Sequence, residues 1–251
     1  MRFITPLLLF FSTTSLFALV SIAPVDIGEK PGLSGNVSGS ISSKSGNTEK
    51  DEYSLGARLQ FDEGARYVVW TTLSYDYGKS DGVKNEDKAY AHLRYIHALQ
   101  GNAWCGELFA QTEQDKFKDI NNRSLVGAGV RWRFFDSAEW GKGYFGLGAM
   151  YEWISYTAAT PNRNEENGRL NSYVAYTKKF MTASKLSYVG YYQPKLDEGS
   201  DYVTTQTLEL IVPIYGTLNL SLSANYAYDS RPPVGVKKKD TAYKTALVWE
   251  F

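Results

Sequence analysis

The last eleven residues of the chain, TAYKTALVWEF (residues 241–251), decide the fold. Tyr243, Thr245, Leu247, Trp249 and Phe251 occupy every second position. A period of two places these side chains on one face of an extended strand. The stretch therefore predicts a β-strand with one apolar face and one mixed face that ends on the aromatic residue Phe251.

The same alternation continues through the rest of the chain. It is clearest in residues 33–41, 53–61, 67–77, 123–134 and 218–228. The predicted strands are about ten to thirteen residues long. Strands of soluble proteins usually have about five or six residues, whereas a tilted membrane-spanning strand needs about nine to eleven. The strand length therefore favours a protein that crosses a membrane with strands.

The connections between these strands alternate between tight and long. We expect tight turns at residues 62–65, 99–102 and 213–216, with two looser ones at 136–142 and 178–184. Long, charged loops are expected at residues 44–51, 78–88, 115–122, 157–168, 195–201 and 229–240. Short turns at one end and long loops at the other are typical of outer-membrane barrels. The sequence predicts an all-β fold: a single transmembrane antiparallel β-barrel of about twelve strands, with short periplasmic turns and longer extracellular loops.

The N-terminus indicates which face of the strands meets lipid. Residues 1–23 have the features of a secretory signal, with Arg2 followed by an apolar run and small residues at Ala18, Ser21 and Ala23, any of which fits a cleavage point. The alternative, a membrane anchor, is disfavoured because the apolar run is short. We expect a short N-terminal extension at residues 24–31 and the barrel at residues 32–251. A soluble lipocalin-like barrel would reverse the polarity, and alternation alone does not choose between the two.

Composition excludes several classes of function. The chain has 27 basic and 27 acidic residues in 251, so bulk charge gives no reason to expect nucleic acid as a partner. A single cysteine, Cys105, excludes an internal disulfide framework and a multi-thiolate metal site. His92 and His97 are five residues apart and face opposite sides of a strand. We expect no metal, no cofactor and no catalytic residues, since no catalytic or nucleotide-binding motif is present.

Three stretches resemble a known family. YDSRPPVGVKKKDTAYKTALVWEF (residues 228–251) is similar to the C-terminal signature of bacterial salt-induced outer-membrane proteins, a barrel domain of unknown function. Residues 38–59 and 123–136 resemble the N-terminal hairpin and central strand of that family. The resemblance implies an outer-membrane barrel with no established activity, and a link to osmotic or salt adaptation through the family's name. The extension at residues 24–31 looks unremarkable.

The polar face of the strands is the candidate functional surface. It is predicted to carry charged side chains that face the lumen, namely Arg58, Arg94, Glu107, Arg131, Arg133, Glu152 and Glu209. Two interpretations remain open. The lumen is a narrow channel for small polar solutes or ions, or these groups form a salt-bridge network that fills a structural barrel. An outer-membrane hydrolase is a third and weaker hypothesis, because His92 has no catalytic motif around it.

The remaining expectations concern location and partners. We expect the protein in the outer membrane of a Gram-negative bacterium, as a monomer among lipids and lipopolysaccharide. Phe251 resembles the signal that recruits the barrel-assembly machinery. In the loop at residues 229–240, Arg231, Lys237, Lys238 and Lys239 could meet lipopolysaccharide phosphates, fold into the barrel, or belong to a solvated turn. Asp115, Asp119 and Asn121 lack the glycine and terminal glutamate of a calcium loop.

Overall fold

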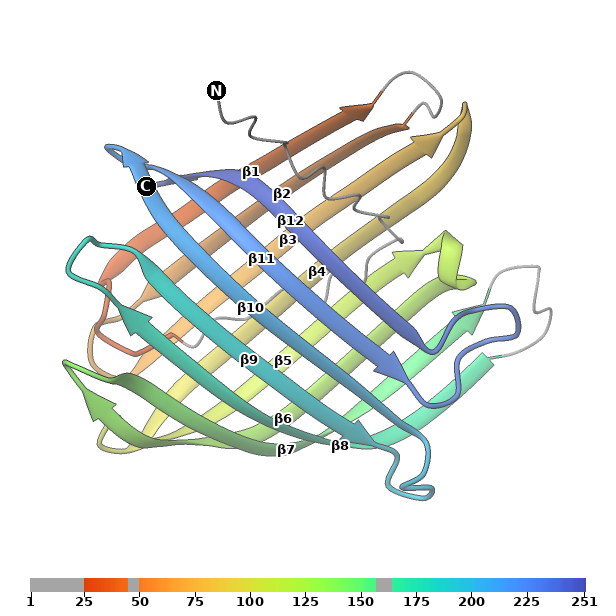
Figure 1. Ribbon diagram of the computed structural model, residues 1–251. Helices are drawn as coiled ribbons and strands as arrows, with labels where there is room; N and C mark the ends of the chain where they lie inside the picture. The colour runs from red at the N-terminus through yellow and green to blue at the C-terminus, as the bar shows by residue number, and fades with distance from the viewer. Residues whose placement is uncertain (1–24, 45–49, 157–163) are drawn as a thin grey trace, which may run out of the picture.

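The computed structural model describes residues 25–44, 50–156 and 164–251, in which twelve antiparallel strands form one closed barrel (Figure 1). The predicted signal at residues 1–23 lies outside the described residues. No helix in the described ranges is long and apolar enough to cross a membrane. The strands are β1 Gly32–Lys44, β2 Lys50–Asp62, β3 Tyr67–Ser80, β4 Val83–Gln100, β5 Trp104–Asp115, β6 Ile120–Ser137, β7 Gly141–Tyr156, β8 Asn164–Lys179, β9 Lys185–Pro194, β10 Tyr202–Tyr215, β11 Leu218–Asp229 and β12 Lys239–Glu250, and a 3₁₀ turn, η1 Lys116–Lys118, precedes β6.

Each strand pairs with the next along the chain, and β1 pairs with β12. The predicted all-β barrel of about twelve strands is confirmed. Two expected long loops are largely strand instead. β3 and β4 run to a two-residue turn, Asp81–Gly82, and both of its residues have positive φ (50° and 75°). Such turns match the twist of a hairpin, and the charged sequence around this one concealed the strand. η1 and β6 likewise occupy most of residues 115–122.

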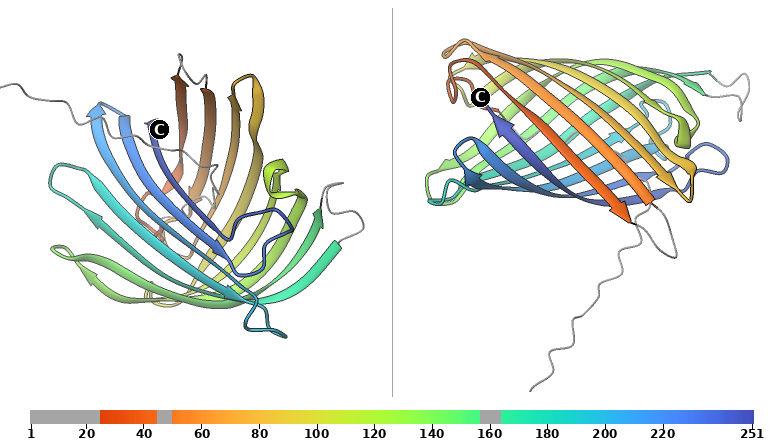
Figure 2. Two further views of the ribbon diagram at one scale, coloured as in Figure 1. Left: turned by 45° about the vertical axis from the view of Figure 1, so that its right-hand side comes forward. Right: turned by 90° about the horizontal axis from the view of Figure 1, so that it is seen from above.

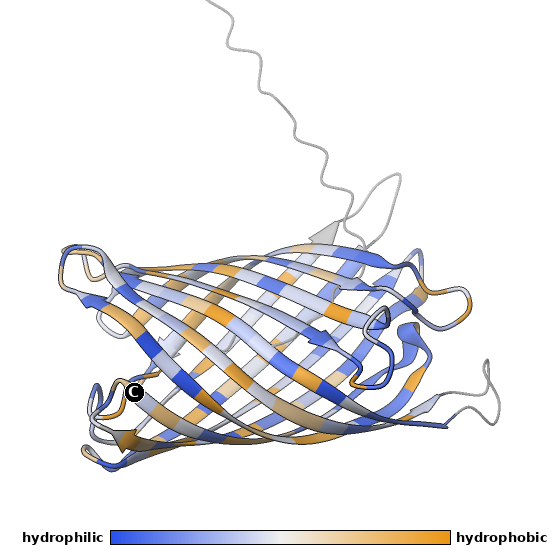
Figure 3. Ribbon diagram, turned by 90° about the horizontal axis from the view of Figure 1, so that it is seen from below, coloured by the Kyte–Doolittle hydropathy of each residue, from blue (hydrophilic) through white to orange (hydrophobic). Residues whose placement is uncertain are grey.

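The outer surface of the barrel is apolar and the inner surface is polar. Hydrophobic and hydrophilic residues alternate along each strand in Figure 3. The outward side chains of Leu33, Leu55 and Leu247 are 67%, 65% and 51% exposed. Contact of so many large apolar side chains with water would be unfavourable in a soluble protein. Aromatic side chains lie near the strand ends, as Trp104 and Trp132 do, with stacked rings 5.6 Å apart. This polarity is opposite to that of a soluble barrel and fits a wall that faces lipid.

The seam that closes the barrel is short. β1 and β12 pair only where residues 36–39 meet residues 247–250. Gly35 and Phe251 add two backbone hydrogen bonds of 2.9 and 3.0 Å. A Cβ at Gly35 would lie 2.8 Å from the Phe251 ring, so only glycine fits beneath the terminal aromatic residue. In the described chain, β1 beyond Gly39 pairs only with β2, and the two views of Figure 2 show this side of the wall.

Candidate functional site

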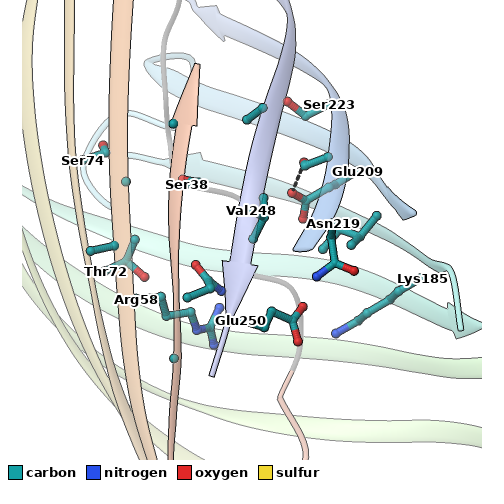
Figure 4. Close-up of a pocket in the computed structure, with 18 of the residues that line it drawn as sticks. Ser38, Arg58, Thr72, Ser74, Lys185, Glu209, Asn219, Ser223, Val248 and Glu250 are labelled. Carbon is teal, nitrogen blue, oxygen red and sulfur yellow. Dashed lines mark hydrogen bonds between the residues drawn. The ribbon is translucent and has the colours of Figure 1, made fainter. Parts of the chain in front are cut away.

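The lumen is divided into a packed half and an open half. Inward side chains of β4 to β8 fill their side of the barrel. Along β1 to β3 and β9 to β12 lies a cavity of about 740 Å³ (Figure 4). Its wall is rich in serine and asparagine, including Asn36, Ser38, Asn219, Ser221 and Ser223. A volume of this size lies within the range of small-molecule sites, and the neutral hydroxyl and amide groups suit polar solutes.

A buried arginine–glutamate network fills the packed half toward the end of the barrel that bears the longer loops. Glu152 has no exposed surface and accepts hydrogen bonds from Arg123 (2.6 and 2.9 Å) and Arg169 (2.6 Å). Arg169 also donates to Asp201 at 3.2 Å. Each charge is therefore compensated, which buried ions require.

A second layer of the packed half surrounds Glu107. This carboxylate accepts a hydrogen bond from Tyr173 (2.8 Å) and pairs with Arg94 (3.4 Å) and Arg131 (3.8 Å). The Tyr173 ring occupies the space over Gly146, where a Cβ would lie 2.0 Å from the ring. Four residues predicted to face the lumen, Arg94, Glu107, Arg131 and Glu152, are thus inside the barrel but within its packing and outside the wall of the large cavity.

His92 and Cys105 pack inside the barrel. His92 is buried, stacks on Trp70 with ring centroids 5.1 Å apart, and hydrogen-bonds Gln111 at 3.3 Å. A hydrolase arrangement would need a Ser or Asp in the place of Gln111. Cys105 is 1% exposed and packs with Trp70 and Ile27. His97 lies on the opposite face, beside Tyr95.

The N-terminal extension is not unremarkable, and that expectation is wrong. Residues 25–31 enter the barrel at the end bearing the short turns. Ile27 is 5% exposed and packs against Trp70 and Cys105. The buried Asp62 carboxylate accepts hydrogen bonds from the backbone amides of Gly28 (2.9 Å) and Lys30 (3.3 Å). Local sequence gave no sign of this because the contacts join segments more than thirty residues apart.

Asp26 attaches the same segment to the opposite wall. It pairs with Lys142 (2.5 Å) and with Arg133 (3.4 Å). Arg133, predicted to face the lumen, therefore lies at the barrel mouth. Burial alone would raise the pKa of Asp26, but the hydrogen bond and charge of Lys142 outweigh burial and hold the pKa below its ordinary value of 3.8. The segment is thus held by carboxylates at both walls and by an apolar side chain between them.

The charged side chains that line the cavity form a set different from the predicted one. Lys30 pairs with Glu250 (2.9 Å), Lys244 with Asp76 (2.9 Å), and Lys179 with Glu29. The remaining three are Arg58, Glu209 and Lys185. The first two were predicted to face the lumen. Lys185 was not among the predicted residues; it is the first residue of β9, directly after the turn expected at residues 178–184.

The longer loops are tied to one another at the opposite end. In the loop at residues 229–240, Arg231 makes a two-pronged contact with Glu198 (2.5 and 2.8 Å), while Lys237, Lys238 and Lys239 are exposed. Lys118 of η1 pairs with Asp115 (3.3 Å) and reaches Asp240 at the start of β12 (3.6 Å). Asp115 therefore serves an ion pair in the place where a calcium ligand was considered.

The closed wall, apolar outside and polar inside, has the fold of an outer-membrane β-barrel. Residues 37–251 match the family model described as "Protein of unknown function, DUF481", and the chain belongs to this family. No match was found among curated proteins.

Among solved structures, the chain is similar to the translocator domain of autotransporter NalP from Neisseria meningitidis, with a TM-score of 0.50, 10% identity and 88% of each chain covered. The NanC porin gives a TM-score of 0.49 at 11% identity, covering 86% of this chain and 97% of its own. The KdgM porin gives 0.43 at 10% identity, covering 87% and 99%. At 10% identity, the likeness to the NalP translocator domain shows a shared barrel fold alone.

Proposed function

We propose that this protein is a narrow outer-membrane channel for small polar solutes. The observation that carries the proposal is the cavity of about 740 Å³ lined by serine, asparagine and charged side chains. A barrel wall needs polar inward residues, but it does not need a cavity of that size. Barrels of eight strands are just filled by side chains, so twelve strands leave room that the packed half only partly uses.

Two structural features make the pathway narrow. The packed half removes part of the cross-section, and the segment at residues 25–31 occupies the mouth at the short-turn end, where Glu29 and Lys30 line the cavity. Solutes would pass between this segment and the wall formed by β1, β2 and β10 to β12. The second candidate is a structural role in the envelope. The compensated network around Glu152 favours it, because fully paired buried charges make the wall rigid and leave no group free to bind a solute.

The cellular setting is part of the proposal. The short turns would face the periplasm and the longer loops the exterior, in a monomer surrounded by outer-membrane lipid. Phe251, which pairs with Gly35 at the end of the closing seam, would be recognised by the barrel-assembly machinery. The exposed lysines at residues 237–239, beside Arg231, would meet phosphate groups of lipopolysaccharide. A role in salt or osmotic adaptation would follow from controlled passage of small solutes.

Thiol modification of single positions during bilayer recording tests the channel. In a Cys105→Ala background, Ser223→Cys places a thiol on the cavity wall, whereas the adjacent Leu222→Cys places one on the outer face. A charged methanethiosulfonate reagent should reduce single-channel conductance in Ser223→Cys and leave Leu222→Cys unchanged. A correctly folded barrel that passes no current over a range of voltage and salt would instead support the structural role.

A further inference from the structure

Two basic side chains of the cavity wall make no direct ion pair. Three of its four carboxylates are paired with lysines, and the fourth, Glu209, accepts a hydrogen bond from Ser221 at 2.8 Å. Among the described residues, neither Arg58 nor Lys185 forms an ion pair. The two cations project into the same cavity from β2 and β9 in Figure 4, and they are close enough for their charges to repel. Glu209 attracts both of them and Glu29 attracts Lys185, without a direct contact. The cavity wall carries five basic side chains against four carboxylates, so one positive charge remains in excess, which favours an anion.

Arg58 is held in a position that leaves its donors available. Its guanidinium carbon lies 4.2 Å from the centroid of the Trp70 ring, and one terminal nitrogen donates to Gln60 at 3.4 Å. The contact with the Trp70 ring and the bond to Gln60 restrict the guanidinium, and its other N–H groups remain for a ligand. A guanidinium edge is suited to bind both oxygens of a carboxylate.

Hydroxyl groups without partners stand beside this cation. Thr72, which is opposite Arg58 in the β2–β3 register, is 7% exposed, and its Oγ1 has no hydrogen-bond partner. The Oγ of Ser74, two residues further along β3, also has none. Both residues line the cavity. Buried hydroxyls without partners are costly, and rotation of these two side chains toward the cavity would let the hydroxyl groups of a ligand satisfy them.

We propose that Arg58, Lys185, Thr72 and Ser74 form a binding site for small hydroxylated carboxylates. The carboxylate sits between the two cations, and its hydroxyl groups contact the side chains of β3. The inference rests on the proposed channel, since it names the class of solute that the pathway selects. Glu209 and Glu29 oppose an anion in this place and limit its affinity, which suits a solute that must also leave.

Calorimetric titration of the refolded barrel tests the site without requiring a current. Gluconate is the probe, acetate the carboxylate without hydroxyls, and inorganic phosphate the alternative oxyanion. Arg58→Gln and Lys185→Gln should each weaken gluconate binding by about tenfold or more, as expected for a lost charge-assisted contact. Thr72→Val should remove the preference for gluconate over acetate. The control, Lys237→Gln, makes the same charge change on an exposed loop and should leave binding unchanged.

Bilayer recording of the same proteins separates the two proposals. In a KCl gradient the wild-type reversal potential should indicate preference for the anion, reduced in Arg58→Gln and increased in Glu209→Gln. Gluconate binding without any current would overturn the channel and keep the site. Current without gluconate binding, or with phosphate bound as tightly as gluconate, would overturn the site and keep the channel.

Discussion

Undocking of the N-terminal segment, residues 25–31, can be measured by the reactivity of Cys105, the only cysteine of the chain. The Asp62 carboxylate holds this segment through two backbone hydrogen bonds, and Ile27 covers Cys105. Asp62→Ala removes both bonds, at about 1.5 kcal/mol or more for each bond to a charged group. A loss of about 3 kcal/mol raises the population of the undocked segment by roughly a hundredfold. Since a thiol reacts only when uncovered, maleimide labelling of Cys105 should accelerate by a similar factor.

The neighbouring residue provides a matched control. Glu63 accepts hydrogen bonds from Ala65 (3.2 Å) and Arg66 (2.8 Å) within the same turn and makes none with the segment. Glu63→Ala should therefore leave labelling of Cys105 near the wild-type rate. Ile27→Ala removes apolar cover without touching the turn and should accelerate labelling too. If Asp62→Ala and Ile27→Ala barrels both migrate as folded species, and Cys105 stays as protected as in the wild type, the docking of the segment described above is refuted.

Further substitutions test the packed half and the mouth. Glu152→Ala removes the carboxylate shared by Arg123 and Arg169 and leaves them only the longer contacts to Glu113 (3.4 Å) and Asp201 (3.2 Å), so it should lower the free energy of unfolding by about 3 kcal/mol in urea titrations. Loss of the exposed Glu198 should cost under about 1 kcal/mol. Gly146→Val drives its Cβ into the Tyr173 ring and should lower the free energy of unfolding by about 1–3 kcal/mol. The control Gly199→Val has open space around it and should be near neutral. Equal effects at both glycines would contradict the packing described above. Because the pKa of Asp26 is lower in the folded state than its ordinary 3.8, its contribution to docking is present above that pH and is lost as pH falls through the lowered value. The protection of the Gly28 amide, taken as its exchange rate relative to the intrinsic rate at the same pH, should fall on acidification less in Asp26→Asn than in wild type. An identical pH response in both proteins would remove Asp26 from the account.

The alternation of side chains, together with the strand length, the pattern of turns and the two ends of the chain, was enough to predict the barrel. Period-two patterning separates an apolar from a polar face; the strand length, the N-terminal signal and the terminal Phe251 indicate that the apolar face meets lipid, and closure follows because lipid leaves no unpaired edge. It does not determine which inward residues meet across the lumen. Arg58 and Arg131 follow the same pattern, yet Arg58 lines the cavity and Arg131 is buried against Glu107. The difference arises from tyrosines on β7 to β9, such as Tyr173, which fill their side of the barrel and depend on glycines of neighbouring strands.

The extension and the extended hairpins were missed for a different reason. Docking of Gly28 on Asp62 depends on a backbone conformation, φ = 82° at Gly28, and on a carboxylate far away in sequence. Neither has a local signature. The charged residues around the Asp81–Gly82 turn suggested a solvated loop, although a strand that continues past the membrane into water tolerates charge on both faces.

The short seam has a consequence for folding kinetics. Every other neighbouring pair in the wall is joined by a single connection, whereas β1 and β12 are the two ends of the chain. Bringing them together has the largest loop-closure entropy, and the ladder that forms there extends over only part of each strand. We therefore expect this pairing to form last during assembly and to separate first in thermal fluctuations. Amide protons along the seam should then exchange faster than those of any other strand pair in the described wall.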